Sequence, residues 1–437
     1  MRLERITLIR PNMGNYCSND ALPPLSIAIL AARTPGDIEI RFFDDRIERI
    51  PEDDTPDLVA LSVETFTARR AYEIANSYRS RGIPVIMGGY HPTLMSDEVL
   101  EHADAIVIGD AEECWERLLH DFKEGNLQQR YSGGNGQSLD DYRIDRTIFK
   151  GKKYIPVELV QYSRGCRFTC EFCSIDAFYK NSVRVRPVQS IVDEIATLDR
   201  KKLLFFVDDN LFSSKKELYE LLDAITPLKF RWSCQISIDA ARDDALLDRL
   251  AESGCIFVLI GFESLSEENL KQMGKSWNKV SGDYIEIVKK FHRRGMAVYG
   301  TFVFGYDHDT PELIEKSLAF ALEAKLEIAN FNPLTPTPGS ALYDRLKSEG
   351  RLIHELWWQD SSYRYGDAIF SPKGMSPDVF SEKCFEAKKR FYSWNSIAQR
   401  LLLSDTKFNL FRFAMVALAN IVSRKEVLKK HHRHLGK

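Results

Sequence analysis

Cys166, Cys170 and Cys173 are the residues whose type and spacing most directly indicate chemistry. They form a C-x3-C-x2-C pattern directly after the apolar run 156–163, which has the composition of a buried strand. Three thiolates this close together can ligate three irons of a [4Fe–4S] cluster. The fourth iron would then be free to coordinate a ligand and to pass an electron to it. The pattern therefore predicts a redox-active iron–sulfur site.

The same cysteines could instead form part of a structural zinc site, which usually takes four protein ligands. No His or Cys follows them closely, so the fourth ligand would have to be a distant residue such as Cys234 or Cys255. We expect the cysteines outside the triplet to be ordinary core or surface residues. No secretory signal is recognisable at the start of the chain, so its 8 cysteines favour metal or redox chemistry over disulfides.

A regular strand–helix alternation surrounds the triplet. The expected strands are 156–163, 203–208, 232–239, 257–263, 298–305 and 328–334. The expected helices begin near Pro187, Ser213, Asp239, Ser266, Thr310 and Thr337, several of which are capping-type residues. Six such units are too few to close an eight-stranded barrel, so we predict an open, partial (β/α)6 barrel. In such barrels the chemistry lies at the carboxyl ends of the strands.

An earlier alternation predicts a second parallel sheet. The expected strands are 5–10, 38–43, 58–63, 85–88 and 105–108, with helix-like stretches between them. This pattern is typical of a doubly wound α/β sheet covered on both faces, which binds ligands beyond the carboxyl ends of its strands. Segments 62–67, 88–93 and 109–112 lie there, and their glycines allow a backbone to approach a bulky ligand closely.

These patterns divide the chain into four parts. Residues 1–131 form the N-terminal sheet domain, and 132–153 form a linker that begins with a Gly-, Asn- and Ser-rich stretch. Residues 154–346 form the partial barrel, and 347–437 form a mostly helical C-terminal extension.

The C-terminal extension combines aromatic and basic residues. Segment 357–365 is rich in Trp and Tyr, which either line an apolar pocket or pack in a core. The tail joins an apolar stretch from Phe408 to basic residues: Lys425, Lys429, Lys430, His431, His432 and Arg433. It either lies on an anionic membrane surface or packs on the barrel with a solvated basic end. Its most apolar part, 413–422, is shorter than the roughly 20 residues of a membrane-spanning helix.

The overall composition excludes several classes of protein. With 437 residues, 44% of them hydrophobic and 28% charged, the chain is neither disordered nor a small disulfide-stabilised scaffold. A net charge of −3 provides no basic field for nucleic acid. We expect a cytoplasmic protein with a small-molecule partner.

Taken together, the motifs resemble those of the radical S-adenosylmethionine (SAM) superfamily, in its cobalamin-binding-domain class. The resemblance rests first on the three cysteines, with Phe172 just before the last of them. It also rests on segments 206–210, 260–263, 300–305 and 333–339. These segments resemble the second, fourth, fifth and sixth strand motifs of the barrel. The match covers roughly residues 5–346, counting the N-terminal sheet.

The resemblance implies roles for individual barrel residues. The open iron would chelate the amino and carboxylate groups of SAM, and an electron would cleave SAM to a 5′-deoxyadenosyl radical. Phe172 would contact the adenine, and Asp208 or Asp209 would accept hydrogen bonds from the methionyl ammonium. Glu263 would lie near the ribose, and the backbone of Val303 to Gly305 would flank the adenine. Each acidic residue has a simpler alternative, because a carboxylate after a strand often caps a helix.

The N-terminal domain resembles the cobalamin-binding sheet of the same class. The implied cobalamin contacts are Ser62, Thr65, Gly88, Gly89, His91, Gly109 and Glu112. The Asp-x-His-x-x-Gly motif, which supplies a histidine to cobalt in methionine-synthase-type domains, is absent. Cobalamin would therefore lack a histidine from that motif, a feature shared with relatives that have lost the cofactor. His91 follows a Gly-Gly turn, which it could equally well stabilise.

The implied function is methylation of an unactivated carbon: one SAM methylates cobalamin, a second yields the radical, and methylcobalamin supplies the methyl group. One alternative is a radical SAM rearrangement, cyclisation or oxidation with cobalamin idle or absent, and another is an iron–sulfur electron-transfer or scaffold protein. An external donor such as flavodoxin or ferredoxin would supply electrons. The C-terminal region resembles the extension of hopanoid-methylase-like relatives, which favours a lipid or tetrapyrrole-like substrate.

Overall fold

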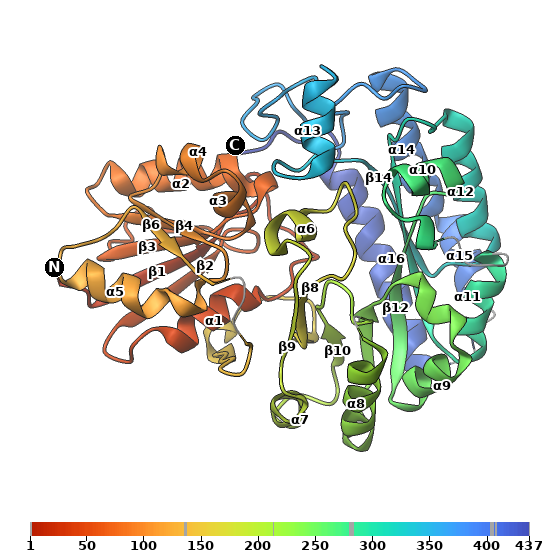
Figure 1. Cartoon of the computed structure of the whole chain (residues 1–437), viewed down its shortest axis with the longest axis horizontal. Helices are drawn as coiled ribbons and strands as arrows, with labels where there is room; N and C mark the ends of the chain where they lie inside the picture. Colours follow the sequence, from red (N-terminus) through yellow and green to blue (C-terminus); the bar gives the residue numbers. More distant parts are fainter. Residues whose placement is uncertain are drawn as a thin grey trace.

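Two six-stranded parallel β-sheets form the frame of the molecule, and C-terminal helices pack beside the second sheet (Figure 1). The computed structural model describes residues 2–134, 138–212, 214–278, 284–402, 406 and 409–436. The predicted fold class is confirmed. Three predicted features fall on residues outside this description: 135–137 of the linker, the helix start at Ser213, and Phe408 of the tail.

The N-terminal sheet has the strand order β2-β1-β3-β4-β5-β6. Its strands are β1 (Arg5–Arg10), β2 (Glu39–Asp44), β3 (Leu58–Ser62), β4 (Val85–Gly88), β5 (Ala105–Ile108) and β6 (Arg130–Ser132). The first five match the predicted strands closely, whereas the short edge strand β6 was not predicted. The chain reverses its direction across the sheet between β1 and β3, and such a reversal opens a crevice at the carboxyl ends of the strands.

Helices cover both faces of this sheet. They are α1 (Leu25–Arg33), α2 (Ala68–Arg79), α3 (Tyr90–Leu94), α4 (Ser96–Leu100) and α5 (Trp115–Lys123). One core joins α1 and α5 to Ile6, Leu8 and Ala60, and another joins α2 to Val59 and Met87. Because both faces are buried, the strands are nearly continuous apolar runs rather than alternating ones.

The second sheet has the order β14-β13-β12-β11-β10-β7. Its strands are β7 (Val157–Val160), β10 (Leu203–Phe206), β11 (Trp232–Gln235), β12 (Cys255–Glu263), β13 (Ala297–Phe304) and β14 (Ile328–Pro333). The outer helices are α7 (Val188–Ala196), α8 (Lys215–Ile225), α9 (Asp244–Glu252), α10 (Glu267–Gln272), α11 (Tyr284–Arg293), α12 (Pro311–Glu323) and α13 (Ala341–Ser348). In the described residues β7 and β14 do not pair, so the predicted open barrel is confirmed.

Two of the six predicted helix starts are capping residues in the structure. Ser266 and Thr310 each accept a hydrogen bond from the backbone N–H three residues on, at the starts of α10 and α12. Two starts were misplaced, because better caps follow. Asp243, not Asp239, caps α9, and Ser340, not Thr337, caps α13.

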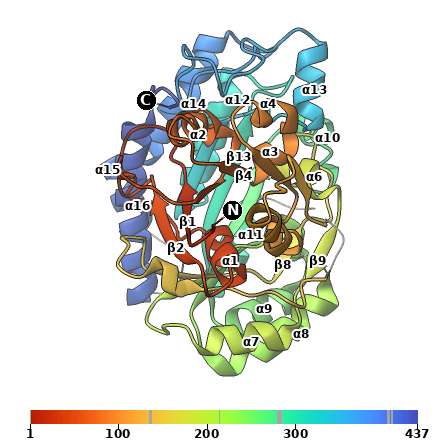
Figure 2. The same cartoon turned by 90° about the vertical axis from the view of Figure 1, so that its left-hand side faces the viewer.

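The C-terminal helices close one side of the barrel. They are α14 (Pro377–Phe391), α15 (Trp394–Leu402) and α16 (Leu410–Lys430), and α14 and α16 pack against β14. In the view from the N-terminal unit, that unit lies in front of the barrel strands and α15 and α16 run along one side (Figure 2). No helix in the described part of the chain is both long and apolar enough to cross a membrane.

The basic end of the tail packs back onto the protein. Lys430 pairs with Asp20 at 2.6 Å, and His432 lies 2.9 Å from Asp367. Leu435 is buried in the core beside α2, and Gly436 forms a bridge to Gly14. This arrangement corresponds to the packed alternative for the tail and brings it beside the N-terminal unit.

Candidate functional site

The three cysteines line one cavity of about 140 Å³ at the carboxyl ends of the barrel strands, here called the cluster cavity. They lie in the loop between β8 (Ser163–Gly165) and α6 (Ser174–Tyr179), and β8 pairs with β9 (Val183–Val185) in a hairpin that was not predicted. Residues from β11, β12 and β13 and from the turn after β10 complete the wall. The structure therefore brings the triplet to the barrel end where chemistry was expected.

The donors on this wall fit a cluster held at three corners. Burial raises the pKa of Cys170 to about 12 and that of Cys173 to about 11, so iron bound to the sulfurs would have to supply the positive charge that stabilises their thiolates. Cys234 and Cys255 do not line the cavity, because they lie against each other in the core between β11 and β12. A zinc site completed by either of them therefore has no support. Among the described residues, no group of three or more His, Cys, Asp or Glu side chains is arranged to hold a single metal ion.

The two aspartates after β10 have different positions. Asp208 is buried, and its carboxylate accepts hydrogen bonds from the backbone N–H of Tyr162 at 3.1 Å and from the backbone and hydroxyl of Ser163. It therefore fastens the segment that leads to the cysteines, and its role as a SAM contact stays a prediction. Asp209 does line the cluster cavity, and it accepts a hydrogen bond from the N–H of Gly165 at 2.9 Å.

Glu263 lines the cluster cavity as an ion pair with Lys275, whose Nζ lies 2.7 Å from its Oε1. Lys275 also lies above the ring of Phe172, with Nζ 5.8 Å from the centroid. The sequence analysis missed Lys275, because it lies in a loop beyond α10 that carries no strand-end motif. A side chain at position 261 would displace the Glu263 carboxylate, since a Cβ on Gly261 would lie 2.2 Å from Glu263 Oε1.

Phe172, Val303 and Gly305 do not share one cavity. Phe172 lines both the cluster cavity and a second cavity beside it, whereas Val303 lines only the second. Gly305 lines neither. Its φ is +119°, and a Cβ on it would lie 2.6 Å from the ring of Phe370 in the C-terminal extension. Gly305 allows the extension to pack tightly on the end of β13, and its contact with adenine stays a prediction.

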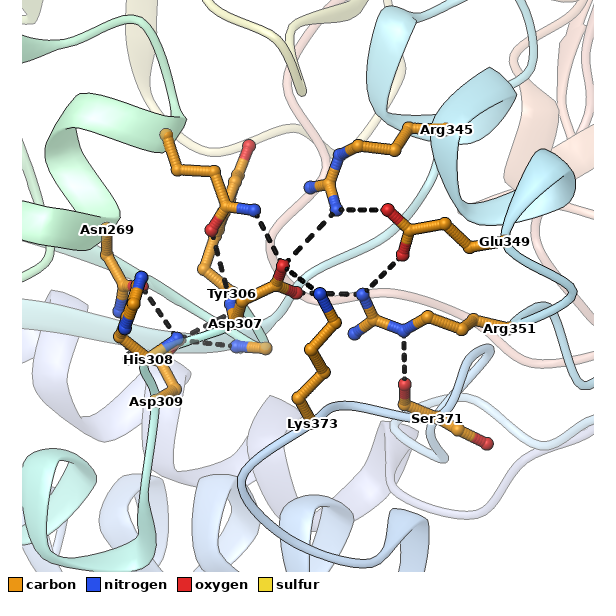
Figure 3. A network of polar contacts seen from close by, with 12 residues as sticks. Asn269, Tyr306, Asp307, His308, Asp309, Arg345, Glu349, Arg351, Ser371 and Lys373 are labelled. Atoms are coloured by element: carbon orange, nitrogen blue, oxygen red, sulfur yellow. Dashed lines mark hydrogen bonds and ion pairs between the residues drawn. The ribbon is translucent and has the colours of Figure 1, made fainter.

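A polar network fixes the loop that follows Gly305 (Figure 3). Asp307 accepts hydrogen bonds from Lys373 at 2.7 Å, Arg351 at 2.8 Å and Gln272 at 2.9 Å. Burial alone would raise the pKa of Asp307, but these donors hold it far below its usual value. Asp309 accepts from the N–H groups of Gly305 and Tyr306 and from Asn269. The extension is thus clamped to the loop after β13.

A cavity of about 410 Å³, here called the interdomain cavity, lies at the carboxyl ends of the N-terminal strands. Of the predicted cobalamin contacts it brings together Ser62, Gly88, Gly89, Gly109 and Glu112. The φ of Gly89 is +111°, and a Cβ on it would lie 2.7 Å from the carbonyl oxygen of Val63. Only glycine fits this turn, which leaves the strand ends open to a ligand.

His91 and Thr65 do not line this cavity. His91 is fully buried, and its Nε2 lies 2.9 Å from the hydroxyl of Tyr72 and 3.3 Å from Glu98. Glu98 also accepts a hydrogen bond from Trp358 of the extension at 2.9 Å. These contacts fit the stabilising alternative for His91, and its contact with cobalamin stays a prediction. Thr65 is buried in a short 3-10 turn before α2.

The interdomain cavity is closed on its other side by the barrel, through Gln161, Arg164, Val207 and Asp209. Arg164 donates a hydrogen bond to Glu112 at 2.5 Å, and its second terminal nitrogen lies 3.0 Å from Asp110. Arg184 pairs with the same Asp110 at 2.5 Å. These buried pairs join the two domains, and the sequence analysis missed both arginines because no motif marks them.

The second cavity beside the cluster cavity has a volume of about 440 Å³ and is here called the aromatic cavity. Its ring-bearing wall residues are Phe66, Phe172, Tyr299, Tyr363, Tyr365, Phe385, Tyr392 and His431. Trp357 and Trp358 are core residues instead, with no exposed surface. The predicted segment 357–365 therefore serves both purposes: its tryptophans pack in the core, and two of its tyrosines line a cavity.

The cluster cavity adjoins each of the other two cavities. Asp209 lines both the cluster and the interdomain cavity, and Phe172 lines both the cluster and the aromatic cavity. A ligand on the cluster cysteines would thus lie next to ligands in each of the other two.

Comparison with known proteins gives two family matches. The Radical SAM superfamily model matches residues 160–321, and the B12 binding domain model matches residues 17–119. The first match contains the cysteine triplet and the barrel strands through β13. The second covers most of the N-terminal sheet. The two matches thus correspond to the two parallel sheets.

Among curated proteins, the chain is similar to two methyltransferases of Chlorobaculum tepidum. It is 29% identical to bacteriochlorophyllide d C-12(1)-methyltransferase over 86% of this chain and 84% of that protein. It is 27% identical to bacteriochlorophyllide d C-8(2)-methyltransferase over 94% of each. Both similarities run through the sheets and into the C-terminal extension.

Among solved structures, the fold is similar to that of TsrM, a radical SAM methyltransferase from Kitasatospora setae with cobalamin and a [4Fe–4S] cluster bound. The TM-score is 0.68 at 16% identity, over 98% of this chain and 99% of that one. At that identity the similarity concerns the fold.

Proposed function

Because this chain belongs to the radical SAM superfamily, in the class that carries an N-terminal B12-binding domain, we propose that it methylates a carbon atom of a tetrapyrrole. It is an enzyme whose cofactors are a [4Fe–4S] cluster, SAM and cobalamin. One observation carries the proposal: the cluster cavity adjoins both the interdomain and the aromatic cavity, through Asp209 and Phe172. Cofactors and substrate would then meet at one point.

In the proposal, Cys166, Cys170 and Cys173 hold the cluster, and Asp209 and Glu263 are contacts for SAM. The bound cluster and SAM supply a carbon-centred radical that opens a C–H bond. The chain itself contributes enclosure. Lys275 fixes the carboxylate of Glu263, and the rings of Phe168 and Trp277 stack at 3.6 Å along the cavity wall. Such walls exclude water that would quench a reactive species.

The interdomain cavity is the proposed cobalamin site, where the bound cofactor supplies the methyl group. Its open glycine turns and Ser62 accept the cofactor, and Arg164 holds the barrel wall against Glu112. None of the described residues that line this cavity is His, Cys or Met. In the proposal, therefore, no His, Cys or Met side chain of the described cavity wall coordinates the cobalt.

The aromatic cavity is the proposed substrate site. Phe66 from the N-terminal domain, Val303 from β13 and Tyr365 from the extension lie on its wall, so all three folded parts enclose it. Flat rings on a wall stack well on a flat conjugated ligand. The similarity to two proteins named for bacteriochlorophyllide d supports a tetrapyrrole over a peptide or lipid. An external one-electron donor of the flavodoxin or ferredoxin type completes the proposal.

The test is methyl transfer by the anaerobically reconstituted full chain. Bacteriochlorophyllide d, SAM with a deuterated methyl group, cobalamin and a reductant are incubated together, and the pigment is analysed by mass spectrometry. The expected product has gained one labelled methyl group, only when cobalamin is present. A product of altered mass without an added carbon would instead indicate cyclisation or oxidation. Formation of deoxyadenosine without any change in the pigment would rule out the tetrapyrrole as the substrate.

A further inference from the structure

One cationic side chain on the wall of the aromatic cavity has no partner within the described residues. Lys388 lies in the last turn of α14, four residues after Cys384, so both side chains are on the helix face that lines the cavity. Its ammonium group makes no ion pair or hydrogen bond to any residue that the structure describes. Burial lowers the pKa of Lys388, because a desolvated ammonium group is disfavoured.

The other charges on this wall compensate one another. Asp20 pairs with Lys430 at 2.6 Å, and Glu426 lies 3.4 Å from Lys430 and 3.9 Å from Lys429. His431 adds no charge at neutral pH, since burial and the neighbouring His432 and Lys388 lower its pKa to about 4. Among the described residues of this wall, Lys388 is therefore the cation that has no carboxylate partner.

Lys388 is half-buried, and a partly desolvated ammonium group beside apolar rings is stabilised when a ligand supplies the counter-charge. The rings of Phe385 and His431 stack at 3.5 Å next to it, so a ligand lying along these rings would bring an anionic substituent within reach. The matching ligand is flat and aromatic and carries a carboxylate.

We propose that Lys388 is the carboxylate-binding subsite of the aromatic cavity, so that the substrate is a free acid held by its anionic group. This rests on the proposed function, because it takes the aromatic cavity as the substrate site. It adds a requirement that the methylation proposal lacks: an esterified pigment should bind much more weakly than the corresponding acid.

The subsite is tested by fluorescence titration of the reconstituted full chain with 1-pyrenebutyrate, a flat aromatic acid, and with its methyl ester. A charge-assisted hydrogen bond contributes about 1.5–3 kcal/mol, so the acid should bind the unaltered chain roughly 10–100-fold more tightly than the ester. Lys388→Met should abolish this preference and leave ester binding unchanged, which also reports that the cavity is intact. Lys388→Arg should retain the preference.

Lys389→Met is the matched control, because Lys389 is the next residue of α14 and is exposed. It removes the same charge from the helix and should keep the preference for the acid. Equal binding of acid and ester to the unaltered chain, binding of neither, or a preference that survives in Lys388→Met would each overturn the inference.

Methylation of bacteriochlorophyllide d is measured separately, so the two proposals can fail independently. Methylation of the pigment without any preference for acids would support the proposed function and contradict the Lys388 subsite. A preference for acids that depends on Lys388, without methylation of the pigment, would support the subsite and contradict the tetrapyrrole as substrate.

Discussion

Arg164 of the barrel donates a hydrogen bond to Glu112 of the N-terminal domain at 2.5 Å, across the wall of the interdomain cavity. The side chain of Arg164 is only 5% exposed, and Asp110 lies on its other side at 3.0 Å. The two domains, each formed around its own parallel sheet, are thus fastened at the edge where their strand ends meet. A cofactor held between them would depend on this contact.

Replacing Arg164 should therefore loosen the interdomain cavity. Arg164→Gln leaves the half-buried Glu112 without this counter-charge and Asp110 with Arg184 alone, and the about 3–5 kcal/mol cost of breaking a fully buried pair is the upper limit of the loss. We expect the variant to lose most of its cobalamin on gel filtration, followed by absorbance of the corrin. Arg143→Gln is the control, since Arg143 pairs with Asp141 and both side chains are exposed. Full cobalamin retention by Arg164→Gln would show that the arginine does not hold the site.

Gly89 should tolerate no side chain. Its φ of +111° and the 2.7 Å approach to Val63 predict that Gly89→Ala destabilises the N-terminal domain by about 1–3 kcal/mol. It should also weaken cobalamin binding, because the turn borders the cavity. Gly82→Ala is the matched control: it has φ of +74° but nothing within 4 Å of its Cβ. Equal losses of melting temperature and of cobalamin in both variants would mean that the contact with Val63 is unimportant.

Glu98 should stabilise the junction between the N-terminal domain and the extension in a pH-dependent way. Although burial opposes it, hydrogen bonds from His91, Tyr72 and Trp358 lower the pKa of Glu98 from 4.5 to about 2. A carboxylate with a lowered pKa in the folded state contributes stability that is fully present above pH 4.5. That contribution declines as the pH falls towards 2.

The measurement is the melting temperature of the full chain and of Glu98→Gln as a function of pH. The variant should be less stable at neutral pH, because it cannot satisfy all three donors. The difference between the two proteins should shrink as the pH falls below 4.5. A difference that is constant with pH would mean that ionised Glu98 contributes nothing.

The sequence predicted the elements and the position of the cysteine triplet at the end of the barrel strands because both leave local patterns. The cysteine triplet is defined by spacing alone, and the strand–helix alternation repeats over more than 100 residues of each domain. Ser266 and Thr310 could likewise be identified as caps, since capping depends on only three or four neighbouring residues.

The sequence could not predict contacts between distant segments. The pair of Arg164 with Glu112 joins residues 52 apart, and the bond from Trp358 to Glu98 joins residues 260 apart. Asp208 and Asp209 are adjacent and chemically identical, so only the fold distinguishes the one that fastens a loop from the one that lines two cavities. Lys388 carries no motif, and its role follows from the absence of a partner among the described residues of the folded chain.

The central claim is that Cys166, Cys170 and Cys173 hold a [4Fe–4S] cluster whose open iron binds SAM. Electron paramagnetic resonance of the anaerobically reconstituted, reduced full chain tests it most directly, with and without SAM. The account predicts the signal of a reduced [4Fe–4S] cluster that changes on addition of SAM and disappears when any one of the three cysteines becomes Ala, but persists in Cys17→Ala. A cluster signal that is indifferent to SAM, or that survives loss of one of the three cysteines, would contradict it.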